Sequence, residues 1–169
     1  MKFTPQSISD VVLIEPNING DDRGCFLETY RQDLLDEAIG YKVNFVQDNE
    51  SKSLKGVLRG LHYQLPPYTQ AKLVRVIEGS VLDVVVDIRK SSLTFGQHVS
   101  LELTAQNKHQ IFVPQGFAHG FIVLSNSATF AYKVDNYYAP DYERGIAFND
   151  AQLKINWQLS AEELQLSSK

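Results

Sequence analysis

The feature of this sequence that most constrains its fold is a succession of short β-rich runs separated by turn residues. Such a pattern predicts a β-sandwich or a β-barrel. Two stretches favour helix instead: the amphipathic Arg31–Ile39, followed by Gly40 as a C-cap, and a short C-terminal helix that begins at the capping box Ser160–Glu163. Ten strands are expected: Val11–Glu15, Cys25–Tyr30, Asn44–Ser51, Val57–Gln64, Lys72–Glu78, Val81–Arg89, His98–Thr104, Gln110–Pro114, Gly120–Ser125 and Thr129–Tyr138.

The size and composition of the chain fit one globular domain. Its 169 residues, 43% hydrophobic and 21% charged, predict a single domain over residues 1–169. Cys25 is the only cysteine, which excludes a disulfide scaffold, and no run approaches the roughly 18 apolar residues of a membrane helix. No apolar stretch follows Lys2 as it would in a signal peptide, so a cytoplasmic protein is expected.

The charge distribution limits the possible partners. The net charge is −4, and the sixteen basic residues are scattered along the chain. Neither nucleic acid nor an anionic membrane is therefore an expected partner. A small anionic ligand is compatible with this composition, because a few converging arginines can bind a phosphate inside an acidic protein.

The run Val81–Arg89 alternates in character along its length. With a period of two, one face is apolar and the other carries the charged residues Asp83, Asp87 and Arg89. Such a strand can pack on a core with one face and line a polar cavity with the other. The alternative is a solvated outer face, which is the usual place for charged residues.

A first candidate site lies in the segment Gly56–Gln64. Strict alternation would send the side chains of Arg59 and His62 to opposite faces of a strand. A β-bulge at Gly60 would let both enter one cavity. A lone histidine more often has a structural or surface role, but the nearby cations Arg59 and Lys72 favour a functional role for His62.

A second segment, Pro114–Phe121, uses a turn with proline and glycine to deliver His119 to the start of a strand. Together the two segments resemble the paired motifs of the cupin β-barrel, a double-sheet jelly roll. Cupins usually hold a metal with a His-x-His pair, a Glu and a further His. Here Gln64 replaces the second His, and Tyr68 and Thr69 stand where the Glu would be. Two imidazoles make a poor metal site, so no metal is expected; His98 and His109 are assigned no function.

Nearly the whole chain resembles the dTDP-4-dehydrorhamnose 3,5-epimerase family of nucleotide-sugar enzymes. The resemblance implies an all-β, cupin-like jelly roll with two or three short peripheral helices, and an isomerase that needs no cofactor. The segments that carry it, in this order, are Asp22–Glu28, Gln47–Asn49, Gly56–Gln64, Gln70–Lys72, Asp83–Arg89, Val113–Phe121, Tyr132–Lys133 and Tyr137–Pro140.

The implied reaction inverts C3 and C5 of dTDP-4-dehydro-6-deoxy-D-glucose to give dTDP-4-dehydro-L-rhamnose, a step in dTDP-L-rhamnose and O-antigen synthesis. Both carbons lie beside the ketone, so each can lose a proton to give an enolate. The chemistry needs a base on one face, an acid on the other and positive charge near the keto oxygen. The resemblance implies that His62 is the base, Tyr132 is the acid and Lys72 stabilises the enolate.

The resemblance also implies where the nucleotide binds. Arg23 and Arg59 resemble ligands of the pyrophosphate, for which a guanidinium is well suited. Phe26 and Tyr138 resemble the pair around the thymine ring. Because the Arg23–Glu28 strand of this family reaches the neighbouring subunit's site, a homodimer is implied. The remaining positions implied to contact the nucleoside, phosphates or sugar are Glu28, Gln47, Asp48, Asn49, His119, Glu143 and Lys169.

One departure concerns the carboxylate that orients the base. Family members usually have a C-terminal Leu-Ser-x-Lys-Asp stretch, whose Asp pairs with the catalytic histidine. This sequence has Leu166–Lys169, and the Asp would come next. Either residues beyond Lys169 supply it or another carboxylate does so, and Asp83 is the candidate within the chain.

Three other functions compete with the 3,5-epimerase. A relative that epimerises only C3 or only C5 would share nearly every residue named above. A non-catalytic cupin that binds a sugar or nucleotide would not need the base, the acid and the lysine together. A metal-dependent cupin would need the ligands that Gln64, Tyr68 and Thr69 replace.

Overall fold

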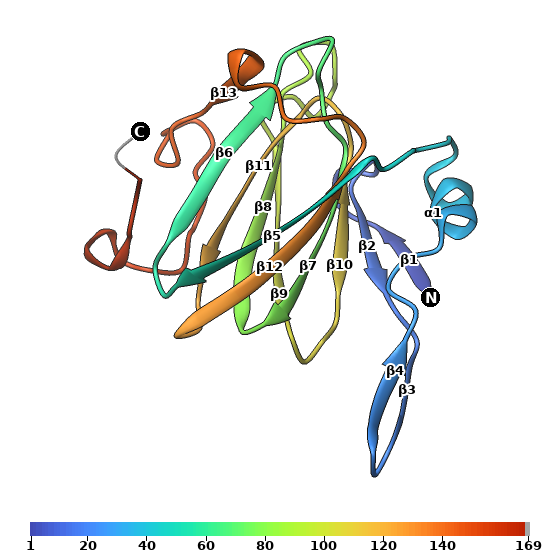
Figure 1. The fold of residues 1–169 in the computed structure, drawn as a ribbon. Coiled ribbons are helices and arrows are strands. Elements are labelled where there is room, and N and C mark those ends of the chain that lie inside the picture. The colour runs from blue at the N-terminus through green and yellow to red at the C-terminus, as the bar shows by residue number, and fades with distance from the viewer. Residues whose placement is uncertain (168–169) are drawn as a thin grey trace.

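The computed structural model describes residues 1–167, and most of their strands form two antiparallel sheets that pack face to face (Figure 1). This is a cupin-like jelly roll, as expected from the resemblance. The six-stranded sheet has the order β1 (Lys2–Pro5), β2 (Val12–Glu15), β10 (Gln110–Val113), β7 (Lys72–Glu78), β12 (Ser127–Val134) and β5 (Gln47–Leu54). The five-stranded sheet has the order β13 (Glu143–Gly145), β6 (Leu58–Gln64), β11 (Phe117–Val123), β8 (Ser80–Asp87) and β9 (His98–Thr104).

The main core fills the space between the two sheets. Inward-facing residues of both sheets form it, and the rings of Phe121 and Phe130 stack across it at 4.2 Å. A second cluster lies on the outer face of the five-stranded sheet, where the C-terminal segment packs through Trp157. Strand β8 is therefore covered on both faces. Its charged residues Asp83 and Asp87 are completely buried, so the solvated outer face considered above does not apply to them.

The helix α1 (Gln32–Ile39) covers a third cluster, through Leu35, on the outside of the six-stranded sheet. It ends as expected at Gly40, which has the left-handed conformation of a C-cap. The predicted C-terminal helix is wrong in extent. Only a 3₁₀ turn, η2 (Ala161–Glu163), forms after the capping box, because Gln165 then runs extended and exchanges backbone hydrogen bonds with Gly56 and Leu58.

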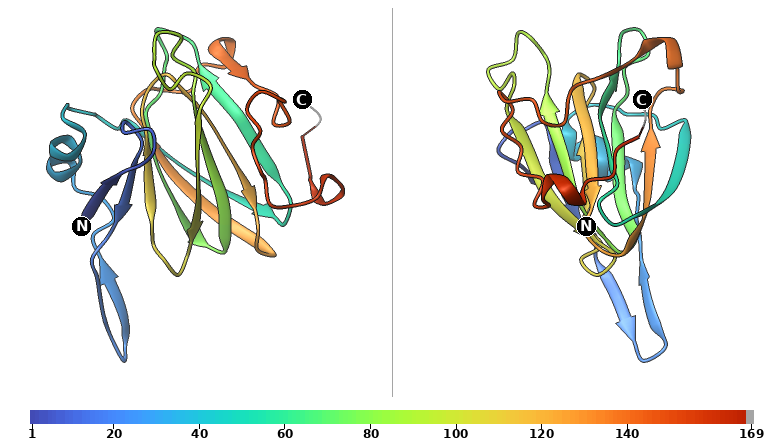
Figure 2. Two further views of the ribbon diagram at one scale, coloured as in Figure 1. Left: turned by 180° about the vertical axis from the view of Figure 1, so that it is seen from behind. Right: turned by 90° about the vertical axis from the view of Figure 1, so that its left-hand side faces the viewer.

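All ten predicted strands occur, with ends displaced by up to a few residues, and β7 and β9 have the predicted bounds. The sequence pattern missed β1, β13 and the strand β3 (Ile18–Asp21), as well as the 3₁₀ turn η1 (Pro140–Tyr142). Strand β3 pairs with β4 (Gly24–Leu27) in a hairpin that projects away from the sandwich (Figure 2). Within residues 1–167, no helix has the length and apolar character needed to cross a membrane.

Candidate active site

A bulge in β6 brings Arg59 and His62 to the same cavity. In the pairing of β6 with β11, His62 lies opposite His119 and Arg59 lies opposite Phe121, so β6 has one residue more than its partner between these two pairs. The extra residue falls at Gly60, as the sequence predicts. Gly60 has a φ of 105°, and a Cβ there would lie 2.5 Å from the carbonyl oxygen of His119, so only glycine fits.

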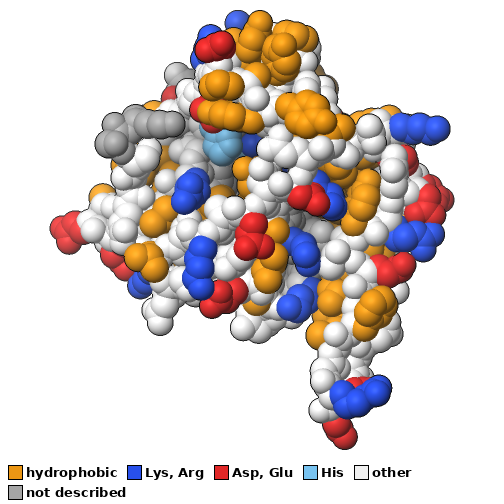
Figure 3. Space-filling model, viewed as in Figure 1, with side chains coloured by type: hydrophobic (Ala, Val, Ile, Leu, Met, Phe, Trp, Pro, Cys, Tyr) orange, Lys and Arg blue, Asp and Glu red, His pale blue; other side chains and the backbone are white. Residues whose placement is uncertain are grey.

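The cavity has a volume of about 1020 Å³ and opens between the two sheets. Its walls come from β6 and β11 on one side, from β7 and β12 on the other, and from the segment around β13 and the C-terminal Gln165–Ser167. Figure 3 shows histidine atoms in a hollow on this face, below a group of exposed hydrophobic side chains. The polar residues that line the cavity are Ser51, Arg59, His62, Lys72, His119, Tyr132, Glu143, Arg144, Gln165 and Ser167.

The predicted base and the predicted enolate-stabilising cation are in contact. The ammonium nitrogen of Lys72 lies 3.3 Å from Nε2 of His62. The positive charge of Lys72, together with burial and the neighbouring His119, lowers the pKa of His62 to about 2. His62 is therefore neutral at physiological pH, as a general base must be.

Lys72 is only 4% exposed, although it carries a charge. Burial lowers the pKa of its ammonium group to about 8, and the negative charges of Asp83 and Glu143 oppose that effect. Lys72 is therefore largely cationic near pH 7 inside a site of low polarity, where a charge acts strongly on a developing enolate.

Tyr132 lines the same cavity from the opposite sheet. It projects from β12, whereas His62 projects from β6. Burial raises the pKa of the Tyr132 phenol, with a smaller opposing effect from Arg59, so the hydroxyl keeps its proton at neutral pH. The predicted acid and the predicted base thus stand on opposite walls of one cavity.

Asp83 does not orient His62, contrary to the possibility raised above. Its carboxylate oxygens lie 2.8 and 3.0 Å from Nε2 of His119, the histidine that β11 places beside it. Within residues 1–167 the side-chain partner of His62 is Lys72. The sequence could place Asp83 on a polar face, but it could not show which of two histidines that face would meet.

The residues that replace the cupin metal ligands have structural contacts of their own. The side-chain amide of Gln64 donates to the carbonyls of Tyr68 and Tyr137, and its oxygen accepts from the amide of Ala139. The hydroxyl of Thr69 bonds to Gln115, and the ring of Tyr68 packs against Tyr142. The side chains of Gln64, Tyr68 and Thr69 thus connect neighbouring loops at the end of the sandwich.

Some of the other predicted ligand residues lie at or near the cavity, and others do not. Glu143 lines the cavity and accepts a hydrogen bond from the hydroxyl of Tyr138 at 3.0 Å, so these two lie together at its rim. Gln47 and Asn49 are bonded to each other on β5, and Asn49 lies opposite Tyr132. Asp48 points outward instead.

The outward position of Asp48 follows from the alternation along β5. Its carboxylate forms an ion pair with Lys133 at 2.9 Å on the outer face of the sheet. Within residues 1–167, nothing brings its side chain toward His62.

The projecting hairpin holds a further set of predicted residues away from the cavity. Arg23 pairs with Asp21 at the hairpin tip, Phe26 is 68% exposed, and Glu28 contacts Arg31. A single chain therefore does not bring Arg23, Phe26 or Glu28 to His62. Lys169 lies outside the described residues.

Sequence reasoning found only part of the wall formed by the C-terminal part of the chain. Residues Arg144–Phe148 and Gln165–Ser167 line the cavity, and of these the resemblance marked only Leu166 and Ser167, within the family's C-terminal stretch. Gly56 offered a further signal. It has a φ of 79°, and a Cβ there would lie 2.0 Å from the carbonyl oxygen of Glu163, so the C-terminal segment must pass directly over it.

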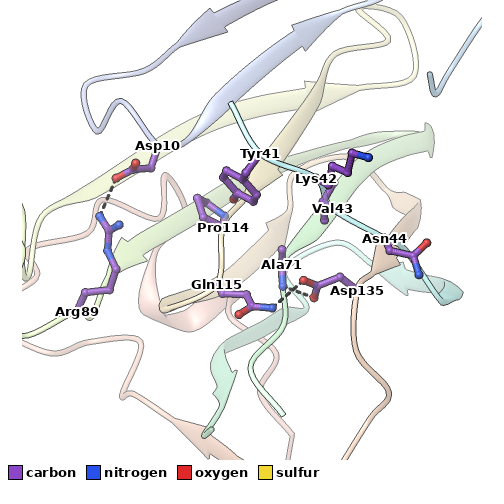
Figure 4. Close-up of a pocket in the computed structure, with 10 residues that line it drawn as sticks. All are labelled: Asp10, Tyr41, Lys42, Val43, Asn44, Ala71, Arg89, Pro114, Gln115 and Asp135. Carbon is purple, nitrogen blue, oxygen red and sulfur yellow. Dashed lines mark hydrogen bonds and ion pairs between the residues drawn. The ribbon is translucent and has the colours of Figure 1, made fainter. Parts of the chain in front are cut away.

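A second cavity of about 590 Å³ lies beside the segment Tyr41–Asn44 (Figure 4). Its charged groups are largely engaged with neighbours in the described structure. Arg89 binds Asp10 at 2.8 Å, and Asp135 accepts hydrogen bonds from Gln115 and from the amide of Ala71. It lacks the pairing of a base with an acid that distinguishes the larger cavity.

The fold and the larger cavity define a cupin-like protein whose cavity brings a histidine, a tyrosine and a buried lysine together. The family model for dTDP-4-dehydrorhamnose 3,5-epimerase matches residues 5–169. The chain belongs to this family.

Three relatives illustrate the similarity. The dTDP-4-dehydrorhamnose 3,5-epimerase of Shigella flexneri is 55% identical over 157 residues, which cover 93% of this chain and 87% of the relative. The crystal structure of dTDP-6-deoxy-D-glucose-3,5-epimerase from Legionella pneumophila in complex with dTDP-4-keto-L-rhamnose has a TM-score of 0.95 and 50% identity, covering 99% of this chain and 88% of that one. The dTDP-4-dehydrorhamnose 3-epimerase of Streptomyces niveus is 38% identical and covers 93% of this chain and 76% of the relative.

Proposed function

We propose that this protein inverts C3 and C5 of dTDP-4-dehydro-6-deoxy-D-glucose and so forms dTDP-4-dehydro-L-rhamnose. One observation carries the proposal. A neutral imidazole, His62, and a protonated phenol, Tyr132, line one cavity from opposite sheets, with the buried ammonium of Lys72 beside the imidazole. Because the chain belongs to the dTDP-4-dehydrorhamnose 3,5-epimerase family, we propose this sugar as its substrate.

Each inversion proceeds by the loss and return of one proton. His62 removes the proton from the carbon beside the ketone, and the electron pair of the C–H bond moves to the keto oxygen. Lys72 stabilises the resulting enolate by its charge. Tyr132 then donates a proton to the opposite face of the same carbon, and exchange with solvent restores both side chains. Lys72 supplies the positive charge, so the proposal requires neither a metal nor a redox cofactor.

The nucleotide half of the substrate would occupy the rim of the cavity. Arg59 lines this cavity and would bind the pyrophosphate, with His119 as a further polar contact. Tyr138 and Glu143, already bonded to each other, would contact the thymidine. The supporting observation is their position around the same opening as His62.

A homodimer would complete this site. The β3–β4 hairpin projects from the sandwich with Phe26 exposed, and in a dimer it would carry Arg23, Phe26 and Glu28 to the partner subunit's cavity. We place the single domain, residues 1–169, in the cytoplasm, as an enzyme that supplies dTDP-L-rhamnose for cell-surface polysaccharides such as O-antigen.

The test is to incubate the protein with dTDP-4-dehydro-6-deoxy-D-glucose in D₂O and to follow C3 and C5 by NMR, with a rhamnose-forming reductase trapping the product. Deuterium at both carbons and the L-rhamnose configuration are expected. Label at only one carbon would instead identify a C3 or C5 monoepimerase. Binding without any exchange would identify a non-catalytic cupin.

A further inference from the structure

Asp83 lies behind the wall of the active-site cavity and is completely buried. It is not among the residues that line the cavity, yet its carboxylate contacts one residue that does, at 2.8 and 3.0 Å from Nε2 of His119. A carboxylate in this pair can only accept, so Nε2 of His119 must carry the proton and donate it. The contact fixes both the tautomer and the orientation of the ring.

The same carboxylate acts on Lys72, which projects from the facing sheet. Within residues 1–167 the direct side-chain partner of the Lys72 ammonium is the neutral His62, which brings no compensating charge. Its electrostatic stabilisation must therefore come from carboxylates farther away, and the two that favour its charged form are Asp83 and Glu143. The titratable groups lining the cavity around it are His62 and Arg59 from β6, His119 from β11, Tyr132 from β12, and Glu143 and Arg144 from β13, with Asp83 behind them on β8.

We propose that Asp83 is a positioning residue of the epimerase site, whose buried carboxylate holds the cavity-lining His119 as the Nε2–H tautomer and fixes its ring. Its negative charge also favours the charged form of Lys72. Asp83 contacts no substrate itself. Glu143 cannot replace it, because the Glu143 side chain is partly exposed at the rim and already bonded to Tyr138. Asp83 is fully enclosed, where a charge acts over a longer distance than it does in water.

This role rests on the proposed function, and it has two measurable consequences. With Nε2 committed to Asp83, the ring nitrogen of His119 that can meet the ligand is Nδ1. With Asp83 present, Lys72 stays charged near neutral pH despite its burial. Removing the carboxylate should therefore affect ligand binding through His119 and turnover through Lys72.

The chain offers a closely matched control in Asp87. This residue lies on the same strand and the same face as Asp83 and is equally buried, but it binds Arg89, Ser92 and Thr94 at the end of the sandwich. The variants Asp83→Asn and Asp87→Asn each remove one buried negative charge from β8. Only the first removes it from the neighbourhood of His119 and Lys72.

The kinetic experiment measures kcat and KM of both variants between pH 5.5 and 9.5, below their melting temperatures. For Asp83→Asn we expect kcat/KM at pH 8 to fall by about 10- to 100-fold, by analogy with the loss of carboxylates that orient histidines in metal sites. The alkaline limb of kcat should move to lower pH, because loss of the anion lowers the pKa of Lys72. Asp87→Asn should lose stability and keep the wild-type profile. Equal profiles for the two variants would overturn the proposal.

A second measurement needs neither a variant nor activity. In ¹⁵N-histidine NMR spectra of the wild-type protein, Nε2 of His119 should remain protonated from pH 6 to pH 9. An Nδ1–H tautomer would overturn the positioning role even if the enzyme were fully active. Conversely, a protein without epimerase activity but with this signature would refute the proposed function and leave the Asp83–His119 contact standing.

Discussion

The ammonium nitrogen of Lys72 lies 3.3 Å from Nε2 of His62, so the cation proposed to stabilise the enolate and the proposed base are direct neighbours. An ammonium group has no acceptor, and the hydrogen bond therefore runs from Lys72 to the imidazole. The contact lowers the pKa of His62 and keeps this base neutral. The pair thus determines how the site responds to pH.

The first prediction is a pH profile with a single alkaline limb. His62 has a pKa of about 2 and stays neutral throughout the neutral range, whereas Lys72 loses its charge as the pH rises through about 8. We expect kcat/KM to be level from pH 6 to pH 7.5 and to fall above pH 8. Steady-state rates in buffers of constant ionic strength measure this. An activity that instead rises through pH 6.5 would mean that His62 titrates as an ordinary histidine.

The second prediction is that Lys72→Met stabilises the protein while removing its activity. The folded state holds this ammonium group in a buried site, at a cost that a thioether side chain avoids. A lowering of the pKa from 10.5 to about 8 corresponds to roughly 3 kcal/mol, since one unit is worth about 1.4 kcal/mol. Urea denaturation at pH 7 should show a gain of this order, because the lowered pKa already includes the attraction to Asp83.

The pH dependence of stability provides the control for this prediction. Between pH 8 and 10.5 the unfolded chain binds the Lys72 proton and the folded state does not, so this residue makes wild-type stability rise with pH in that window. Lys72→Met should lack that contribution. Lys133→Met, which removes an outward-facing lysine paired with Asp48, should change stability by only about 0.5 kcal/mol. A destabilised Lys72→Met protein would contradict the prediction.

Local patterns in the sequence were sufficient to predict a β-sandwich or β-barrel, and the resemblance to known families implied the jelly roll and the residues assigned to the site. Turn residues marked the ten strands, and a glycine inside the run Gly56–Gln64 indicated the bulge that brings Arg59 and His62 into one cavity. The positive φ of 105° at Gly60 favours glycine, so a glycine at this point of the run is a local signal of the bulge.

Contacts between distant strands could not be predicted in the same way. The pairing of Asp83 with His119 depends on the register between β8 and β11, and the contact of Lys72 with His62 crosses from one sheet to the other. The hairpin β3–β4 has exposed residues on both faces and lacks the hydrophobic alternation of a core strand. Most of the C-terminal wall was missed because Ile146–Phe148 lie outside regular secondary structure and Gln165 forms only an isolated bridge.

The third prediction is that Gly60→Ala disrupts the site more than the backbone cost of a positive φ would do by itself. A Cβ at this position would lie 2.5 Å from the carbonyl oxygen of His119 and 2.7 Å from Cα of Gly120, so the two strands must separate. Gly96→Ala is the control, since Gly96 also has a positive φ of 78° but has open space around it. Both should lose about 1–2 kcal/mol for the backbone conformation, with a further loss and reduced turnover for Gly60→Ala. Equal effects would mean that the strands adapt.

The fourth prediction concerns the base. His62→Ala should lower kcat by about 10²- to 10⁴-fold, the usual cost of losing a general base. The affinity for dTDP, measured by calorimetry, should change little, because Arg59 and Tyr138 rather than His62 are assigned to the nucleotide. His98→Ala, a histidine at the start of β9 outside the cavity, should behave as wild type. Turnover near the wild-type rate in His62→Ala would remove His62 from its assigned role.

The last prediction separates proton removal from proton delivery. Tyr132→Phe deletes only the donor hydroxyl and keeps the ring, which packs against the main core. His62 and Lys72 remain, so the enolate can still form. It would then be reprotonated slowly by water, or on the original face by His62 itself. We therefore expect Tyr132→Phe to exchange hydrogen at C3 or C5 with D₂O while it gives far less inverted product than the wild type.

A purely structural role for Tyr132 predicts a different outcome, in which stability falls and exchange and inversion decline together. Tyr30→Phe gives that reference, because Tyr30 is half-buried against Phe45 and lies outside the cavity. Exchange and inversion should be measured by NMR on one sample of each variant, so that differences in folded fraction cancel from their ratio. If Tyr132→Phe has a ratio of exchange to inversion well above the wild-type value and Tyr30→Phe does not, Tyr132 is the acid. Inversion at the wild-type rate would make Tyr138, at the rim of the same cavity, the next candidate.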